Sequence, residues 1–281
     1  MKTRLASATK EIFIGDGQPT RLIGERINPS GKKKLSEALK AGELDIVREE
    51  ALAQVQAGAD LLDINVNLFG VDDKKLLSEV VRLVMETVDV PLCIDSPHPE
   101  AIEAGLKAYS GKPLINSVTG EKHSLEIILP LVKHYGAAVI GLLQDDQGIP
   151  NTPDRRVAIA HDIIERAEAL GIPREDVMID ALVMAVGADP QSGSVTLETI
   201  RRIRAELGVN VVLGASNISF GLPDREVLNN AFVALALGAG ATCLIVDVAR
   251  VRPAVLAADL ALGRDDYARR YIAGFRQRSA R

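Results

Sequence analysis

Eight short apolar runs, with helical patterns between them, are the feature that most constrains the fold of this chain. Each run is rich in β-branched residues and continuous rather than alternating, which is typical of parallel strands covered on both faces. The stretches between the runs carry apolar residues at helical spacing, and several end in glycine, such as Gly58, just before the next run. The predicted strands are residues 21–27, 61–66, 91–96, 113–118, 137–143, 177–183, 211–216 and 243–248.

Eight β/α units in 281 residues predict an α/β fold, a single-domain (β/α)8 TIM barrel. An open doubly wound sheet is the alternative, but no glycine-rich GxGxxG turn follows the first predicted strand. We expect residues 1–20 to form an N-terminal cap segment, a small hairpin at the barrel bottom, and residues 21–281 to form the barrel domain. The tail from residue 265 to 281 predicts a last helix with a basic, frayed end.

Composition and charge exclude several classes of function. The net charge is −5, so strong nonspecific affinity for nucleic acid or for an anionic membrane is not expected. The chain lacks a membrane span, which would need about 18 uncharged apolar residues, and its N-terminus lacks the apolar region of a secretory signal. Cys93 and Cys243 lie inside apolar runs and are interpreted as small buried hydrophobic residues. We therefore expect a cytoplasmic protein.

Polar residues stand at the ends of all eight predicted strands. Because the active site of such a barrel lies at the mouth formed by the carboxyl ends of its strands, these residues are candidates for binding and catalysis. Any one of them could be a helix cap or a turn residue. Three carboxylates converging on one mouth, however, would repel each other unless a ligand or hydrogen-bond donors compensated them. In strand order the residues are Glu25 and Asn28; Asp63, Asn65 and Asn67; Asp95 and Ser96; Asn116 and Ser117; Gln144, Asp145 and Asp146; Asp180; Ser216 and Asn217; and Asp247.

The residue types in this set indicate the chemistry of the ligand. A metal site would need His, Cys or carboxylates at ligand spacing, and no pair among the four histidines has HxxxH or HExxH spacing. A GxSxG nucleophile turn is missing, and no phosphate-binding glycine loop is evident after the last two strands. Carboxylates accept paired N–H bonds, and Asn offers both a donor and an acceptor, so the set suits a flat, nitrogen-rich heterocycle with an amino-pyrimidine unit.

Five motifs carry a family resemblance. They are IGERIN (23–28), GADLLDINV (58–66), CIDSPHPEAIEAGL (93–106), PLINSV followed by GE (113–121) and GASNISFG (214–221). In this order they resemble the motifs of the pterin-binding methyltransferases, which are the methyltetrahydrofolate:corrinoid protein methyltransferases and the folate domain of cobalamin-dependent methionine synthase. The resemblance runs from about residue 21 to 250 and implies a (β/α)8 barrel. It also implies an enzyme that moves the N5-methyl group between methyltetrahydrofolate and the cobalt of a corrinoid, in either direction.

The resemblance assigns roles to single residues. The family holds the pterin ring with an Asp of the third strand, an Asn of the fourth and an Asp of the sixth, which match Asp95, Asn116 and Asp180. The Asn that contacts the N5 region matches Asn217. We therefore expect Asn217, Asp95 and Asp180 to be the catalytic residues, each also binding the pterin.

The resemblance adds residues to the pterin-binding set. This chain also departs from the family pattern at two positions. The family has Pro after the strand-six Asp, where this chain has Ala181. Some members have Gln three positions after the functional Asn, where this chain has Phe220, which is closer to the methionine synthase pattern. The further pterin-binding residues are Glu25, Asn28, Asp63, Gly214 and Ser216.

The implied reaction needs assistance at N5, because a neutral amine would otherwise leave as an anion. We expect Asn217 to donate a hydrogen bond to N5 that strengthens as charge develops, and the proton to come through water. The methyl acceptor would be a Co(I) corrinoid on a partner protein, since the chain lacks the DxHxxG corrinoid-binding signature. No metal bound by this chain is expected, and the resemblance implies a homodimer.

Two other functions remain open. A dihydropteroate synthase shares the barrel and the pterin pocket, but its pattern needs a Ser-Arg-Lys segment after the seventh strand, where this chain has Ser216 and Asn217 without a lysine. A non-catalytic folate-binding subunit would keep the pocket without the chemistry. The basic run Lys32–Lys34 either attracts the glutamate tail of folate or an acidic partner, or forms a solvated helix start.

Overall fold

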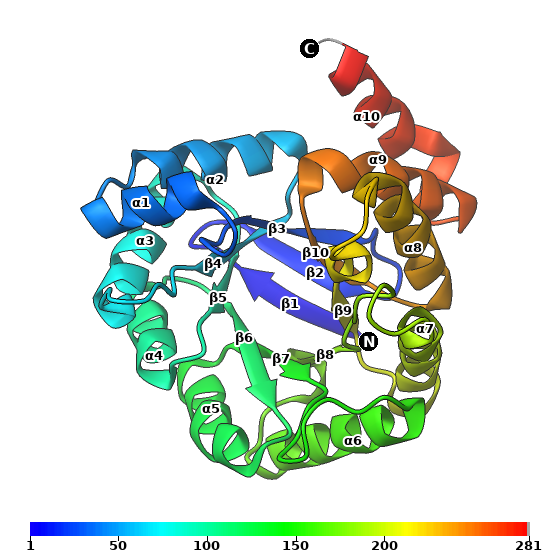
Figure 1. Ribbon diagram of the computed structural model, residues 1–281, viewed down its shortest axis with the longest axis horizontal. Coiled ribbons are helices and arrows are strands. Elements are labelled where there is room, and N and C mark those ends of the chain that lie inside the picture. The colour runs from blue at the N-terminus through cyan, green and yellow to red at the C-terminus, as the bar shows by residue number, and fades with distance from the viewer. Residues whose placement is uncertain (280–281) are drawn as a thin grey trace.

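The computed structural model describes residues 1–279, which form a closed barrel of eight parallel strands inside a ring of helices (Figure 1). The strands follow one another around the barrel in sequence order, and the last strand pairs with the first. The predicted barrel is therefore confirmed over the open sheet. The barrel strands are β3 (Arg21–Ile27), β4 (Leu61–Asn65), β5 (Leu92–Asp95), β6 (Leu114–Thr119), β7 (Ala138–Leu142), β8 (Val177–Asp180), β9 (Val211–Gly214) and β10 (Cys243–Val246).

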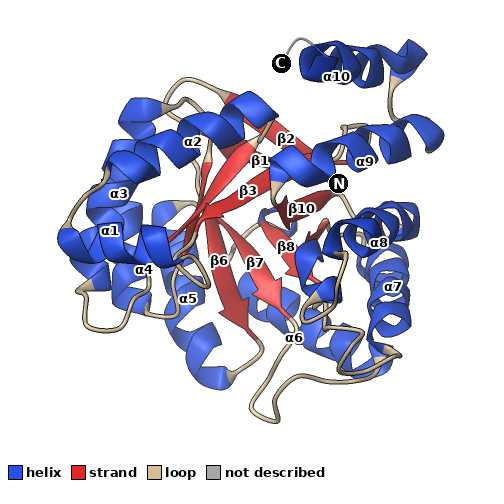
Figure 2. Cartoon of the chain, turned by 45° about the horizontal axis from the view of Figure 1, so that its top comes forward, coloured by secondary structure: helices blue, strands red, loops and turns tan. Residues whose placement is uncertain are grey.

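Helices connect successive strands and cover the outside of the barrel (Figure 2). Gly58 ends the helix before β4 in a left-handed conformation (φ 103°), and its N–H donates to the carbonyl of Val55, as its place in the sequence predicted. The helices are α1 (Lys33–Ala41), α2 (Asp45–Ala57), α3 (Asp73–Thr87), α4 (Pro99–Ala108), α5 (Lys122–Tyr135), α6 (Pro153–Ala169), α7 (Ser192–Arg202), α8 (Arg225–Ala239), α9 (Val248–Ala261) and α10 (Arg269–Ser279). Short helical turns lie at η1 (Arg174–Asp176), η2 (Ile203–Leu207), η3 (Ala215–Ser219) and η4 (Asp266–Ala268).

The main apolar core lies between the barrel and its helices. Leu77, Val80 and Val84 of α3 are fully buried there, and so are Ile64 and Ile94 of the strands beneath them. Each such side chain contributes about 1.5–3 kcal/mol by leaving water. Because the strands are covered on this face and filled on the other, their sequences are continuous apolar runs.

A hairpin within residues 1–20 closes the amino-terminal end of the barrel. β1 (Lys2–Ala6) and β2 (Glu11–Gly15) are antiparallel, and they cross the far end of the barrel in Figure 1. Leu5, Ile12 and Ile14 belong to one apolar cluster with inward-facing strand residues such as Met178 and Cys243. The opening for a ligand is therefore at the opposite end, where the strands have their carboxyl termini.

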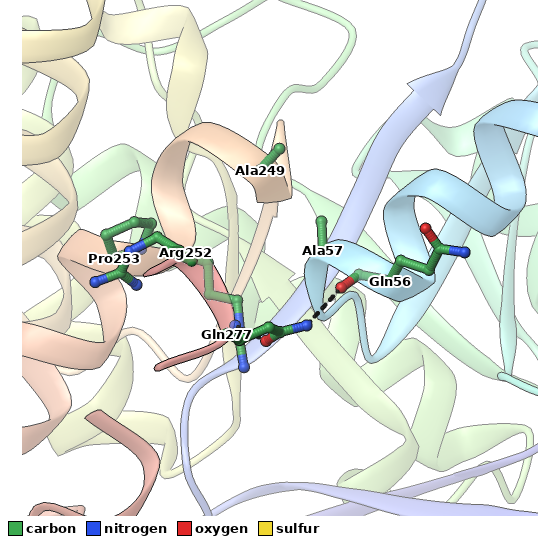
Figure 3. Close-up of a pocket in the computed structure, with 7 residues that line it drawn as sticks. Gln56, Ala57, Ala249, Arg252, Pro253 and Gln277 are labelled. Carbon is green, nitrogen blue, oxygen red and sulfur yellow. Dashed lines mark hydrogen bonds between the residues drawn. The ribbon is translucent and has the colours of Figure 1, made fainter. Parts of the chain in front are cut away.

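The last helix, α10, projects from the barrel beside α9 (Figure 1). A Cβ atom at Gly274 would lie 2.5 Å from Leu256 Cδ1, so the two helices approach closely there. Gln277 accepts a hydrogen bond from Arg252 and donates one to the carbonyl of Gln56 at the end of α2, each at 2.9 Å, beside a small cleft of about 50 Å³ (Figure 3). The predicted frayed end falls partly on residues 280–281, which lie outside the described residues. No helix within residues 1–279 has the length and apolar character that a membrane span requires.

Candidate active site

The strand-end residues line two clefts at the carboxyl-terminal mouth of the barrel. The first cleft, of about 480 Å³, has Asp95, Asn116 and Gln144 among its lining residues. The second cleft, of about 550 Å³, is lined by the loops that follow β3, β9 and β10, and it contains the predicted residues Glu25, Asn28, Ser216 and Asn217. The sequence predicted one mouth, and the structure divides the candidate residues within it into two groups.

Asp63, Asp95, Asn116 and Asn65 form one hydrogen-bonded cluster. The parallel register pairs Asn65 with Asp95 and Asp95 with Asn116, so the three strand ends lie side by side. Asn116 Nδ2 donates to Asp63 Oδ1 at 3.3 Å, and Asn65 Nδ2 donates to Asp95 Oδ2 at 2.9 Å. The two carboxyl groups also lie close enough to affect each other's pKa.

Burial sets the protonation of this pair. Asp63 is 2% exposed, and burial, reinforced by the charge of Asp95, raises its pKa well above the usual range. Burial also raises the pKa of Asp95 to about 6, although the hydrogen bond from Asn65 and the neighbouring Asp63 oppose the rise. Cys93, which pairs with Asp63 in register, is fully buried, as predicted.

Asp180 occupies the end of β8. One carboxylate oxygen accepts a hydrogen bond from the Leu182 N–H at 2.8 Å. Burial nevertheless raises the pKa of Asp180 to about 6, against the effects of the Leu182 and Gly214 backbone and of the nearby positive charge of Arg156. The side chain therefore remains close to a protonation change near neutral pH.

Arg156 is a buried cation that the sequence did not single out. Its guanidinium is 2% exposed and donates to the carbonyls of Pro150, Ala181 and Leu182 and to the hydroxyl of Thr196. Burial lowers its pKa, and Asp180 is the acid that counteracts this. Ala181, where the family has Pro, thus contributes its carbonyl to the support of the loop after β8.

Glu25 and Ser216 lie together in the second cleft, where Ser216 Oγ donates to Glu25 Oε1 at 3.4 Å. Burial raises the pKa of Glu25, with the Lys32 ammonium acting against it and Asp247 with it. Lys32 donates at 3.1 Å to three carbonyls, those of Glu25, Arg26 and Asn28, so it holds the loop after β3 together. Of the basic run, only Lys33 and Lys34 are fully exposed.

Asn217 lies on the turn η3, directly after β9, and its side chain is exposed to the second cleft. A Cβ atom at Gly214 would lie 3.2 Å from Asn217 Nδ2, so glycine at that position leaves room for the amide. Asn28 also lines this cleft, but its Oδ1 accepts a hydrogen bond from the Ser30 N–H at 2.9 Å, which is the local turn-making role of an Asn. Asn217 is thus the more available of the two amides.

The predictions from the sequence missed two residues of the site, Arg156 and Arg225, and gave too little weight to a third, Asn65. Asn65 was recognised only as one of many strand-end residues, although it contacts Asp95 directly. Arg156 and Arg225 each stand in the first turn of a predicted helix, where an arginine normally faces water, so no sequence signal marked them. Among residues 1–279 no group of three or more His, Cys, Asp or Glu side chains could hold a metal ion.

Comparisons with known proteins identify relatives of this chain. The methylcorrinoid:tetrahydrofolate methyltransferase of Eubacterium limosum is 32% identical over 266 residues, which cover 91% of this chain and 96% of that enzyme. The methionine synthase of Mycobacterium tuberculosis is 31% identical over 245 residues, covering 83% of this chain but only 21% of the synthase.

Solved structures of dihydropteroate synthases have the same fold. The Yersinia pestis enzyme with a pterine-sulfa conjugate superimposes with a TM-score of 0.70 at 18% identity, covering 93% of this chain and 99% of the other. The Vibrio fischeri enzyme gives a TM-score of 0.71 at 18% identity, covering 93% and 98%. The sequence model of the pterin binding enzymes matches residues 24–247, most of the barrel. The chain therefore belongs to the family of pterin-binding enzymes.

Proposed function

We propose that this enzyme is a methyltransferase that moves the N5-methyl group between methyltetrahydrofolate and the cobalt of a corrinoid carried by a partner protein. The observation that carries the proposal is the joint presence, at one barrel mouth, of a buried acid–amide cluster and an exposed amide on η3. The 32% identity to a methylcorrinoid:tetrahydrofolate methyltransferase over nearly the whole chain adds to it.

The cluster suits the pyrimidine half of the pterin. A 2-amino-pyrimidinone offers neighbouring N–H donors beside a carbonyl acceptor, and a carboxylate accepts two such donors at once. In the proposed complex Asp95 and Asp180 accept from the ring, and Asn116 supplies both a donor and an acceptor. Asp63, which accepts a hydrogen bond from Asn116 and lies close to Asp95, orients both without needing to touch the ring.

Asn217 acts on the other end of the bicyclic ring. Its Nδ2–H donates to N5, and this hydrogen bond strengthens as electron density accumulates on N5. In transfer to the corrinoid, N5 keeps the electron pair of the broken N5–carbon bond and takes up one proton, while the methyl group bonds to the electron pair of Co(I). In the opposite direction N5 supplies the electron pair and loses the proton. Water in the open mouth carries this proton, because Asn217 itself does not titrate.

The methyl acceptor must reach the mouth from outside. Several apolar side chains stand exposed on loops at this end of the barrel, among them Phe69 after β4 (98% exposed) and Ile149 after β7 (45% exposed). In the proposal they contact the corrinoid protein. Cytoplasmic location and a homodimer remain predictions of the same account.

The direct test is to mix the protein with methyltetrahydrofolate and free Co(I) cobalamin and to follow the visible spectrum. We expect the Co(I) absorbance to be replaced by that of methylcobalamin, and the Asn217→Ala variant to lose rate far more than pterin affinity. Binding of methyltetrahydrofolate without any spectral change would favour the non-catalytic folate-binding subunit. Formation of dihydropteroate in place of methyl transfer would favour a dihydropteroate synthase-like enzyme.

A further inference from the structure

The segment that carries Asn217 is held by an arginine outside the predicted site. Arg225, the first residue of α8, donates from Nη2 to the carbonyl of Ser216 and from Nε to Ser219 Oγ, each at 2.9 Å. These two acceptors flank Asn217 in the chain. One planar guanidinium thus contacts the chain on both sides of the proposed catalytic amide.

The chain reversal after η3 brings Arg225 into this position. Phe220 N–H donates to the Asn217 carbonyl, and Gly221 and Asp224 adopt left-handed conformations (φ 78° and 47°), which turn the chain back over η3. The Arg225 guanidinium then lies 5.8 Å from the centroid of the Phe220 ring, within the range of a cation–π contact. Phe220, which stands where some family members have Gln, therefore has an assignable role as the platform under this guanidinium.

Arg225 forms these contacts without a carboxylate partner among the ion pairs of residues 1–279. A surface arginine at the start of a helix gains little stabilisation from the first turn of that helix. The N-terminus of α8 is the positive end of the helix dipole, so a cation there is mildly unfavourable for the helix. The structure therefore contains a charged side chain whose hydrogen bonds serve η3 rather than its own helix. Because Ser219 is fully buried and Ser216 also contacts Glu25, the two anchoring points are themselves fixed to the barrel.

We propose that Arg225, supported by Phe220, is a positioning residue that fixes the orientation of the Asn217 amide toward N5. The proposal rests on the function proposed above. A misplacement of a reacting group by about 1 Å costs up to roughly 100-fold in rate, and loss of a charge-assisted hydrogen bond corresponds to about 10- to 100-fold. Removing Arg225 should therefore lower methyl transfer strongly while leaving the pterin-binding cluster around Asp95 intact.

The test is a double-mutant cycle of Arg225→Ala and Asn217→Ala, with methyltetrahydrofolate and free Co(I) cobalamin as substrates. We expect Arg225→Ala to lower the transfer rate about 10- to 100-fold, with the pterin Kd changed less than about threefold. In the Asn217→Ala background the same change should cost less than about threefold, because the group it positions is already absent. The matched control is Arg201→Ala, an exposed arginine on α7.

Two further variants separate positioning from charge and from folding. Arg225→Lys keeps the charge but loses the planar fork, so we expect it to remain impaired, and a wild-type rate would overturn the proposal. Ser219→Ala removes only the Nε acceptor and should give a smaller loss of the same kind, which keeps the idea testable if Arg225→Ala lowers the thermal midpoint. Full additivity with Asn217→Ala, or a loss expressed mainly in Kd, would refute the role of Arg225. A wild-type rate for Asn217→Ala would refute the role of Asn217 on which this proposal rests, whereas no methylcobalamin formation by the wild-type protein would refute the proposed function.

Discussion

Replacing Asp95 by Asn should stabilise the folded protein at neutral pH while impairing its pterin site. The pKa of Asp95 is about 6 in the folded protein against an ordinary value of 3.8, a difference of 2.2. In the folded state the carboxyl group binds a proton up to about pH 6, but in the unfolded chain only up to about pH 4. The unfolded state therefore binds fewer protons between these values, and the free energy of unfolding falls as pH rises through this window.

The size of this effect follows from the pKa difference. At 1.36 kcal/mol for each pKa unit, the charge of Asp95 costs up to about 3 kcal/mol of stability above pH 7. The amide of an Asp95→Asn variant carries no such charge. Its oxygen still accepts the hydrogen bond from Asn65. We expect the variant to be more stable than wild type by up to about 3 kcal/mol at pH 8 and by much less at pH 4.5.

Urea unfolding midpoints at pH 4.5 and pH 8 measure this difference. Asp45→Asn is the control, because this exposed side chain lies in the first turn of α2, far from the cluster, and should change stability by less than about 0.5 kcal/mol at either pH. An increase in stability for Asp95→Asn that is the same at both pH values, or a loss of stability at pH 8, would show that burial does not raise the pKa of Asp95 as argued.

Three further predictions concern the site and its surroundings. Asp180→Asn should weaken pterin binding by about 10- to 100-fold, because the single oxygen of the amide cannot serve both the Leu182 N–H and the ring; a fluorescence titration that finds unchanged affinity would contradict this. Arg156→Met should lower the free energy of unfolding by about 3 kcal/mol, since it leaves buried carbonyls such as that of Ala181 unpaired, and a urea midpoint equal to that of wild type would be evidence against it. Phe69→Ser should raise KM for a corrinoid protein without altering the rate with free cobalamin, and an equal loss with both acceptors would place Phe69 outside the docking surface.

The barrel could be predicted from the sequence because its strands have a recognisable residue pattern. Residues buried on both faces must be apolar, so all eight strands were visible as continuous runs, and the first matched Arg21–Ile27 at both ends. Six predicted strands were longer than the observed ones, and two of them show the reason. The run 177–183 ends at Asp180 because that carboxylate accepts from the Leu182 N–H and the chain turns there, with Leu182 at φ 58°. The run 211–216 ends at Gly214 because the next residues form η3.

The site could be predicted only as far as the strand ends define it. Asp63, Asp95, Asn116 and Asp180 follow from their places at the ends of parallel strands, which meet at one mouth. The hydrogen bonds from Asn65 to Asp95 and from Asn116 to Asp63 depend on the stagger between neighbouring strands, which no single sequence reveals.

The contributions of Arg156 and Arg225 depend on loop conformation. Each lies at the start of a helix with an ordinary amphipathic pattern. Arg156 finds its acceptors in the loop after β8, which is distant in the sequence, and Arg225 finds its acceptors because the chain reverses after η3. The loop conformation also decides the contacts of Lys32, whose ammonium donates to three carbonyls of β3 and of the loop after it.

A crystal structure with methyltetrahydrofolate bound would test the central claim most directly. The account predicts that the pyrimidine ring lies within about 3.2 Å of Asp95, Asn116 and Asp180 side-chain atoms, with N5 at a similar distance from Asn217 Nδ2. A folate bound elsewhere, or seated in the barrel mouth with N5 turned away from Asn217, would contradict it.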